Sequence, residues 1–139
     1  MKIAVVYWSS TGNTEAMAQA VVEGAKHAGA EAELFTAAEF DGGKMDEFDA
    51  VAFGCPAMGA EELEDGEFAP MFETCESKLS GKKIALFGSY GWGDGEWMRT
   101  WEENCRDKGA NLVCDSVICQ ETPDDEALSV CRSLGEALA

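Results

Sequence analysis

The apolar residues of this chain fall into short continuous runs that alternate with helically spaced stripes. The run from Ile3 to Trp8 predicts a strand over residues 2–7 that is buried on both faces. The alternating residues 31–36 and the apolar runs at 50–54, 83–88 and 111–118 predict four further strands. Between them, apolar side chains recur at helical spacing: Met17, Val21, Ala25 and Ala28; Phe68, Met71, Phe72, Cys75 and Leu79; Met98, Trp101 and Cys105; and Ala127, Val130, Cys131, Leu134 and Leu138.

Residues that start or stop helices flank these stripes. The first helix is expected to begin at Thr14 and to end at Gly29, because glycine commonly terminates helices. Thr122 is expected to cap the last helix, with Pro123 at its first position. The segment Asp41-Gly42-Gly43 predicts a loop.

Strands and helices therefore alternate along one domain, residues 1–139, with no repeat or linker between them. Such a pattern predicts an α/β fold in which helices cover a parallel sheet. In these folds, ligands bind beyond the carboxyl ends of the strands. That rule selects three loops as the candidate site, at residues 9–14, 55–62 and 89–95.

The charge of the chain is strongly negative. Asp and Glu number 27 against 10 Lys and Arg, for a formal net charge of −17. Such a surface repels nucleic acid and anionic membranes, so we expect neither as a partner. It suits a basic protein partner, reached through electrostatic steering, although acidity that only maintains solubility is the alternative.

The sequence shows no targeting segment, no membrane span and no cysteine spacing typical of a disulfide framework. The sequence lacks the pattern of a secretory signal, and no apolar run approaches the ~20 residues of a membrane span. None of the six cysteines forms a CxxC pair, so we expect reduced thiols and a cytoplasmic protein. Cys75, Cys105 and Cys131 lie on apolar helix stripes, where a thiol acts as a small hydrophobe. The single histidine, His27, has no spaced partner, which argues against a metal site.

The first candidate loop has the composition of a phosphate-binding turn. Hydroxyl residues and one glycine separate a strand from a helix, and the free N–H groups of that helix add donors and partial positive charge. The loop contains no Lys or Arg, so neutral donors would hold the phosphate. Its residues are Ser9, Ser10, Thr11, Gly12, Asn13 and Thr14.

The other two loops offer surfaces for a flat ring. Met58 has a polarizable thioether that packs well on aromatic faces. Trp92 stands between Gly91 and Gly93, which permit close approach of the backbone to a ligand. A phosphate at one end and a flat ring between Met58 and Trp92 describe a flavin mononucleotide (FMN) site. The alternative is that both side chains pack into the core.

These loops resemble those of the flavodoxin family, in particular the short-chain group whose flavin lies between a Met and a Trp. The resemblance covers essentially the whole chain and rests on segments 7–14, 54–59 and 87–93. It implies a flavodoxin-like, doubly wound, five-stranded parallel sheet in the order 2-1-3-4-5, with helices on both faces. The strand after Val113 runs directly to the last helix, without the insertion of the long-chain group.

The resemblance also implies a role for individual residues toward FMN. Met58 and Trp92 should cover the two ring faces, Glu61 should accept from the flavin N3–H, and the peptide between Gly59 and Ala60 should lie beside N5. In the family such a peptide can flip on reduction. Pro56 has no N–H, so it cannot donate to the cofactor as a Ser there could. The implied FMN contacts are Ser9, Ser10, Thr11, Gly12, Asn13 and Thr14; Pro56, Ala57, Met58, Gly59, Ala60 and Glu61; and Ser89, Tyr90, Gly91, Trp92, Gly93 and Asp94.

The function implied is a low-potential, one-electron carrier rather than an enzyme. It would act as a monomer between redox proteins, with basic or ferredoxin-type partners. The segment from Glu61 to Glu76 holds seven acids and no Lys or Arg, and we interpret it as a docking surface for a basic partner. The alternative for this segment is a merely solvated helix start.

The same loops argue against several other functions. An FMN-dependent reductase of a small substrate is the main alternative, but no GxGxxG for a nicotinamide cofactor is present, since position 96 is Glu. A receiver domain needs an Asp where the chain has Gly54-Cys55, and a P-loop needs Lys where it has Asn13. No cysteine starts the Cys-x5-Arg of a phosphatase.

Overall fold

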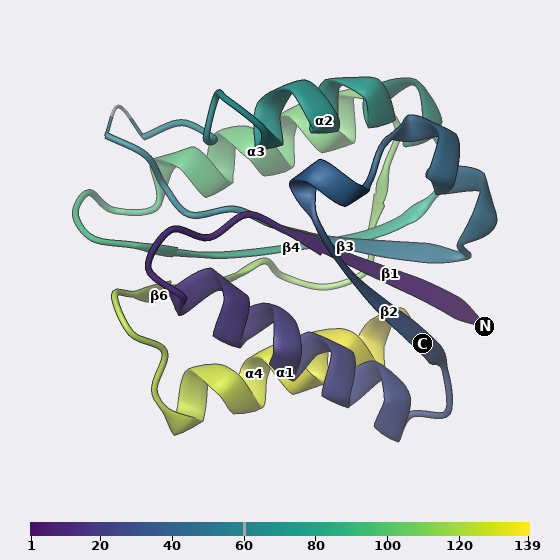
Figure 1. The fold of residues 1–139 in the computed structure, drawn as a ribbon, viewed down its shortest axis with the longest axis horizontal. Coiled ribbons are helices and arrows are strands. Elements are labelled where there is room, and N and C mark those ends of the chain that lie inside the picture. Colours follow the sequence, from purple (N-terminus) through teal and green to yellow (C-terminus); the bar gives the residue numbers. More distant parts are fainter. Residues whose placement is uncertain (60) are drawn as a thin grey trace.

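The fold is a single parallel sheet with helices on both faces, seen in a computed structural model that describes residues 1–59 and 61–139 (Figure 1). The strand order is β2-β1-β3-β4-β5, and β6 also pairs with β4, which confirms the predicted fold class. Helices α2 and α3 cover one face of the sheet, and α1 and α4 cover the other (Figure 1). The strands are β1 (Lys2–Tyr7), β2 (Glu31–Thr36), β3 (Ala50–Gly54), β4 (Lys83–Tyr90), β5 (Asn111–Leu112) and β6 (Val117–Gln120); the helices are α1 (Asn13–His27), α2 (Phe68–Cys75), α3 (Glu96–Asp107) and α4 (Asp125–Leu138).

The last strand is not continuous, contrary to the prediction of one strand over 111–118. Ile84 of β4 pairs with Leu112 and Phe87 pairs with Val117, so four residues of the edge strand lie between these pairs where β4 has two. The extra residues bulge out because an edge strand has no neighbour on its other side to hold a regular ladder. Pairing then resumes and continues to Gln120, opposite Tyr90.

Two helix boundaries also differ from the sequence-based expectation. The cap of α4 is Asp124 rather than Thr122: its carboxylate accepts a hydrogen bond from the backbone N–H of Ala127 at 2.8 Å. Pro123 therefore lies before the helix and not at its first position. The predicted loop at 41–43 instead opens a 3-10 helix, Gly42–Glu47, because the Asp41 side chain caps it through the N–H of Gly43.

The sheet separates two apolar clusters. The cluster under α2 and α3 is rich in aromatic rings, such as Phe53 against Phe72 with ring centroids 5.0 Å apart. The helical cysteines Cys75, Cys105 and Cys131 are fully buried, as predicted for small apolar side chains. Burial raises the pKa of both Cys105 and Cys131 to about 12, which keeps these thiols protonated and unreactive.

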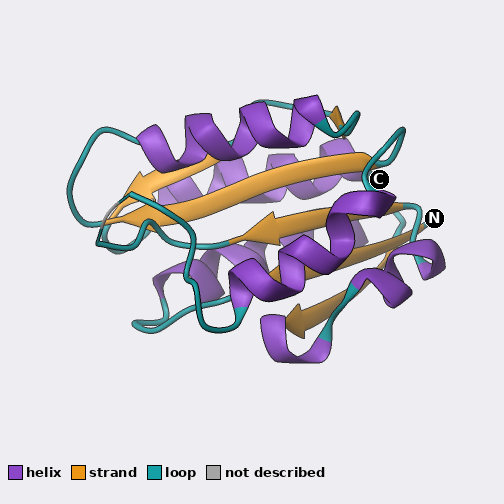
Figure 2. Ribbon diagram, turned by 90° about the horizontal axis from the view of Figure 1, so that it is seen from above, coloured by secondary structure: helices purple, strands orange, loops and turns teal. Residues whose placement is uncertain are grey.

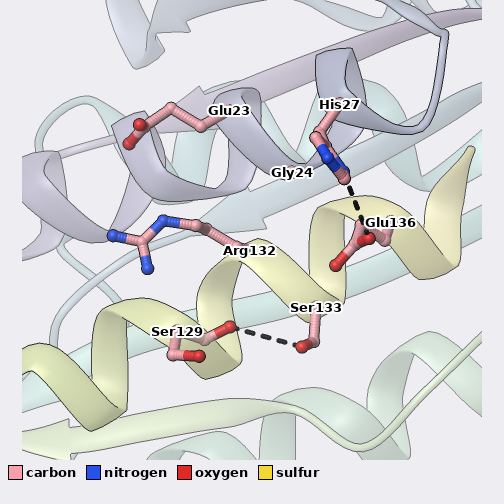
Figure 3. A pocket seen from close by; sticks show the side chains of 7 residues that line it. All are labelled: Glu23, Gly24, His27, Ser129, Arg132, Ser133 and Glu136. Carbon is pink, nitrogen blue, oxygen red and sulfur yellow. Dashed lines mark hydrogen bonds and ion pairs between the residues drawn. The ribbon is translucent and has the colours of Figure 1, made fainter.

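The helices α1 and α4 pack closely because a glycine stands at each side of their contact. A Cβ on Gly24 would overlap the Arg132 carbonyl, and one on Gly135 would overlap the Val21 carbonyl. Beside this contact lies a polar groove of about 380 Å³, lined by side chains that include Arg132, His27 and Glu136 (Figure 3). None of its lining residues belongs to the three candidate loops. Within the described residues, no helix is long and apolar enough to cross a membrane.

Candidate functional site

The three predicted loops meet at one end of the sheet. They follow β1, β3 and β4, which are parallel neighbours (Figure 2), so their carboxyl ends lie side by side. Backbone hydrogen bonds tie these ends together: Trp8 N–H donates to Gly54 O at 3.0 Å, and Ala57 N–H donates to Ser89 O at 3.0 Å. The structure thus brings together three segments that are spread over residues 9–95 of the chain.

The first loop ends in a helix terminus that no side chain caps. Gly12 stands at the N-cap of α1 with a φ of 94°, a left-handed conformation that favours glycine. The Ser9 hydroxyl accepts from the N–H of Gly12 at 3.0 Å, which closes the turn. Because no side chain accepts from the first N–H groups of α1, they remain available for an anion.

The hydroxyl residues of this loop differ in exposure. Ser10 and Thr11 are exposed, whereas Ser9 and Asn13 are half-buried. Thr14 is 1% exposed, and its hydroxyl lies 3.2 Å from the Ser89 hydroxyl of the third loop. Thr14 therefore links two loops from beneath the turn, a role that the sequence did not indicate.

The second loop is held by two backbone hydrogen bonds. Met58 N–H donates to Glu62 O at 2.9 Å, and Glu61 N–H donates to Met58 O at 2.8 Å. Glu61 adopts a φ of 53°, which is rare for a residue other than glycine. Met58, Pro56 and Ala57 are half-buried, and Gly59 is exposed. Ala60 lies outside the described residues, so the expected flip of its peptide bond stays a prediction.

Glu61 carries a buried acceptor without a partner. Its Oε1 atom is shielded from solvent and receives no hydrogen bond from the described residues. The same carboxylate lies against Gly93, where a Cβ would overlap it. An unpaired buried acceptor costs about 1–3 kcal/mol. An N–H donor from a bound ring, such as flavin N3–H, is the complement that this site lacks, so Glu61 fits FMN.

The third loop projects an aromatic ring into solvent. Trp92 is 62% exposed, so the alternative that it packs into the core is wrong. Tyr90 is half-buried, with its ring centroid 5.5 Å from that of Trp97. Asp94 is exposed, and its carboxylate accepts from the Arg99 guanidinium at 3.0 Å.

Sequence reasoning counted Glu64 only as one of the acids of the segment 61–76. It is buried, and its carboxylate accepts from the N–H groups of Gly66, Glu67 and Phe68 at 2.7–2.8 Å. Burial tends to raise the pKa of Glu64, but these donors together hold that pKa below its ordinary value. An acid a few residues before an apolar helix start was the available signal for this cap.

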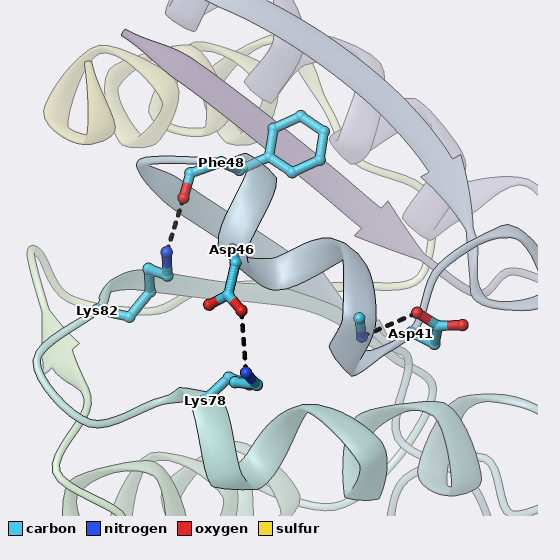
Figure 4. A network of polar contacts seen from close by, with 6 residues as sticks. Asp41, Asp46, Phe48, Lys78 and Lys82 are labelled. Carbon is cyan, nitrogen blue, oxygen red and sulfur yellow. Dashed lines mark hydrogen bonds and ion pairs between the residues drawn. The ribbon is translucent and has the colours of Figure 1, made fainter.

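The basic side chains of the described residues gather mainly at the opposite end of the sheet. Lys82 directly precedes β4, Lys83 is its first residue, and Lys2 is the first residue of β1. Lys78 binds the Asp46 carboxylate at 2.9 Å, and Lys82 donates to the Phe48 carbonyl at 2.7 Å (Figure 4). The loops at the carboxyl ends of the strands therefore stand in a field of largely uncompensated negative charge.

Comparison with known proteins agrees with this geometry. The flavodoxin family model matches residues 5–135. The chain is 45% identical to the flavodoxin of Megasphaera elsdenii, covering 99% of this chain and 98% of the relative, and 43% identical to that of Clostridium beijerinckii, covering 97% of each.

Solved structures show the same fold. The two-electron reduced Megasphaera elsdenii flavodoxin superposes with a TM-score of 0.89 over 98% of this chain and 97% of that one, at 45% identity. A flavodoxin from the domain Archaea gives a TM-score of 0.88 at 30% identity, covering 100% of this chain and 96% of that one. The chain belongs to the flavodoxin family: it is an FMN-dependent electron carrier, not an enzyme.

Proposed function

We propose that the three loops hold FMN with its phosphate at the start of α1 and its ring between Met58 and Trp92, and that the bound flavin is a low-potential, one-electron carrier. The observation that carries this proposal is the unpaired Oε1 of Glu61, buried beside Gly93 of the Trp92 loop. FMN, when bound, supplies the electron-transfer chemistry.

At the phosphate end, the chain supplies neutral donors. The N–H groups of the first turn of α1 carry no side-chain cap, and the helix terminus has partial positive charge. The exposed hydroxyls of Ser10 and Thr11 can donate from the loop. Because this loop contains no Lys or Arg, a bound phosphate would add its negative charge to an already acidic protein.

At the ring end, the chain supplies two apolar covers and one acceptor. The exposed Trp92 indole would lose its contact with water on a flat ligand, which stabilises the complex. The half-buried Met58 covers the opposite face. Glu61 would fix the orientation of the ring by accepting its N–H, and that hydrogen bond relieves the cost of its buried, unpaired oxygen.

The negative charge of the protein favours a low reduction potential for the second electron. A second electron adds negative charge within a protein of formal net charge −17, whose cations lie mainly at the far end of the sheet. Electrostatic repulsion disfavours that step.

A redox titration of the FMN-loaded protein, followed by absorbance, tests this proposal. We expect two separate one-electron steps, with the second at the lower potential. A single two-electron step would contradict the proposal and favour a reductase of a small substrate.

We further propose that the carrier is a cytoplasmic monomer that docks basic or ferredoxin-type redox proteins through its acidic end. The six free cysteines are consistent with a reducing compartment. Exposed acids Glu62, Asp65 and Glu73 support a docking surface on the segment 61–76. Electron-transfer rates to a basic partner should then fall steeply as ionic strength rises. Rates that do not respond to salt would overturn this docking surface.

A further inference from the structure

A small pocket opens between the second loop and the helices α2 and α3. Its volume is about 260 Å³. Leu63, Ala69, Trp97 and Trp101 form its apolar part. Glu61, Glu62, Asp65, Thr100 and Asn104 are its polar lining residues.

The charge of this pocket is unbalanced. Three of its lining residues are carboxylates, and none is Lys, Arg or His. The cation nearest in sequence on α3, Arg99, is held elsewhere by the Asp94 carboxylate and carbonyl, each at 3.0 Å. Within the described residues, therefore, no cation among the lining residues offsets Glu61, Glu62 and Asp65.

The two indoles that line the pocket differ in their hydrogen bonding. Trp101 is 2% exposed, and its buried indole Nε1–H donates to no described residue. The neighbouring Trp97 is equally buried, but its indole N–H donates to the carbonyl of Cys55 at 3.2 Å. Trp97 is therefore fixed by a hydrogen bond, whereas the Trp101 indole is held by packing against Phe68 and Phe72.

We propose that this pocket receives one Lys or Arg side chain of a redox partner. The proposal rests on the docking function proposed above and narrows it to one anchor. A long basic side chain suits the pocket, because its stem packs on Leu63 and the indoles while its head meets carboxylates. A second copy of this chain fits poorly, since each copy carries a net charge of −17.

The position of the pocket suits electron transfer. Glu61 lines it and also lies against Gly93 of the Trp92 loop. An anchored partner would consequently stand next to the ring end of the FMN site.

Variants that replace carboxylates with amides distinguish the effect of this anchor from that of the general acidity of the surface. The test variant is Glu62→Gln with Asp65→Asn, and the matched control is Glu103→Gln with Asp107→Asn, two exposed acids outside both the pocket and the segment 61–76. Both doubles change the net charge equally. The readout is the second-order rate of electron transfer from the FMN-loaded, reduced protein to a basic c-type cytochrome at low salt.

We expect the pocket double to slow this rate about tenfold, and the control double to change it less than about twofold, since close pairs matter more than distant ones. Equal slowing by both doubles would overturn the anchor and leave the acidic docking surface intact. A salt-insensitive rate in every variant would overturn both. Salt-sensitive rates with no effect of the pocket double would overturn the anchor alone.

A structural readout uses the two indoles of α3. In ¹⁵N spectra with the reduced, diamagnetic cytochrome, the Nε1–H signals of Trp97 and Trp101, which both line the pocket, should move in the wild type and stay in place in the pocket double. An unmoved Trp101 signal at saturation would contradict the anchor. A Trp101 signal that moves with the concentration of the chain alone would identify a second copy as the occupant and also overturn it.

Discussion

The Thr14 hydroxyl at the start of α1 lies 3.2 Å from the Ser89 hydroxyl at the end of β4, and both side chains are at most 5% exposed. This hydrogen bond joins the proposed phosphate loop to the strand that leads into the Trp92 loop. The two ends of the proposed FMN site are consequently linked by a buried hydrogen bond.

We expect Thr14→Val and Ser89→Ala each to lower the free energy of unfolding of the FMN-free protein by about 1–3 kcal/mol, because each leaves one buried hydroxyl unpaired. The double variant leaves neither hydroxyl behind, so its loss should be smaller than the sum. Urea unfolding of the four proteins measures this coupling. Strictly additive losses would show that the hydrogen bond contributes nothing.

Gly93 and Gly91 form a matched pair on the third loop. Gly93 has a φ of 86°, and a Cβ there would overlap the Glu61 carboxylate; a Cβ on Gly91 meets nothing within 4 Å. Gly93→Ala should therefore lower the free energy of unfolding by about 1–2 kcal/mol, the usual cost of a left-handed alanine, and should weaken FMN binding by moving Glu61. Chemical denaturation should show no comparable loss for Gly91→Ala. Similar losses in both variants would contradict this account.

Substitution of Trp92 should weaken cofactor binding without destabilising the fold. Because 62% of this side chain is exposed, Trp92→Ala should change the stability of the FMN-free protein by no more than about 0.5 kcal/mol. FMN binding should weaken by about 1–3 kcal/mol, the scale of aromatic stacking on a base, and the potential for the second electron should rise. Titration by flavin fluorescence quenching measures the affinity, and Trp92→Phe should restore part of it. An unchanged affinity would place Trp92 away from the ring.

The buried Glu64 carboxylate should make the free energy of unfolding depend on pH. Its pKa in the folded protein is lowered, so its contribution is present above the unfolded-state pKa and is lost as pH falls through the folded-state pKa. Glu64→Gln should cost about 1–3 kcal/mol near neutral pH, since an amide cannot accept all three N–H donors.

Unfolding measured from pH 7 to pH 3 should show the gap between the wild type and Glu64→Gln closing toward acid. Glu73→Gln, at an exposed acid without such donors, is the control and should show little loss at any pH. A gap that stays constant with pH would mean that the Glu64 charge does not stabilise the helix start.

The sequence by itself determined the layers of the fold and the place of the site. Strands buried on both faces leave continuous apolar runs, and amphipathic helices leave a period of 3.6 residues, so the runs at 2–7 and 50–54 were predictable. Parallel order then placed the loops with Ser9, Met58 and Trp92 at one edge. Local competition was less predictable: Asp124 caps α4 in preference to Thr122, and the edge strand bulges between Leu112 and Val117.

Only the tertiary structure decided which groups meet. The Thr14–Ser89 hydrogen bond spans 75 residues of sequence, and no local pattern encodes such a pairing. Whether a polar atom has a partner depends on every element that surrounds it, so the unpaired Glu61 Oε1 and Trp101 Nε1 became visible only in three dimensions. Residue types and their spacing are local properties of a chain, whereas burial and hydrogen-bond satisfaction are properties of the packed molecule.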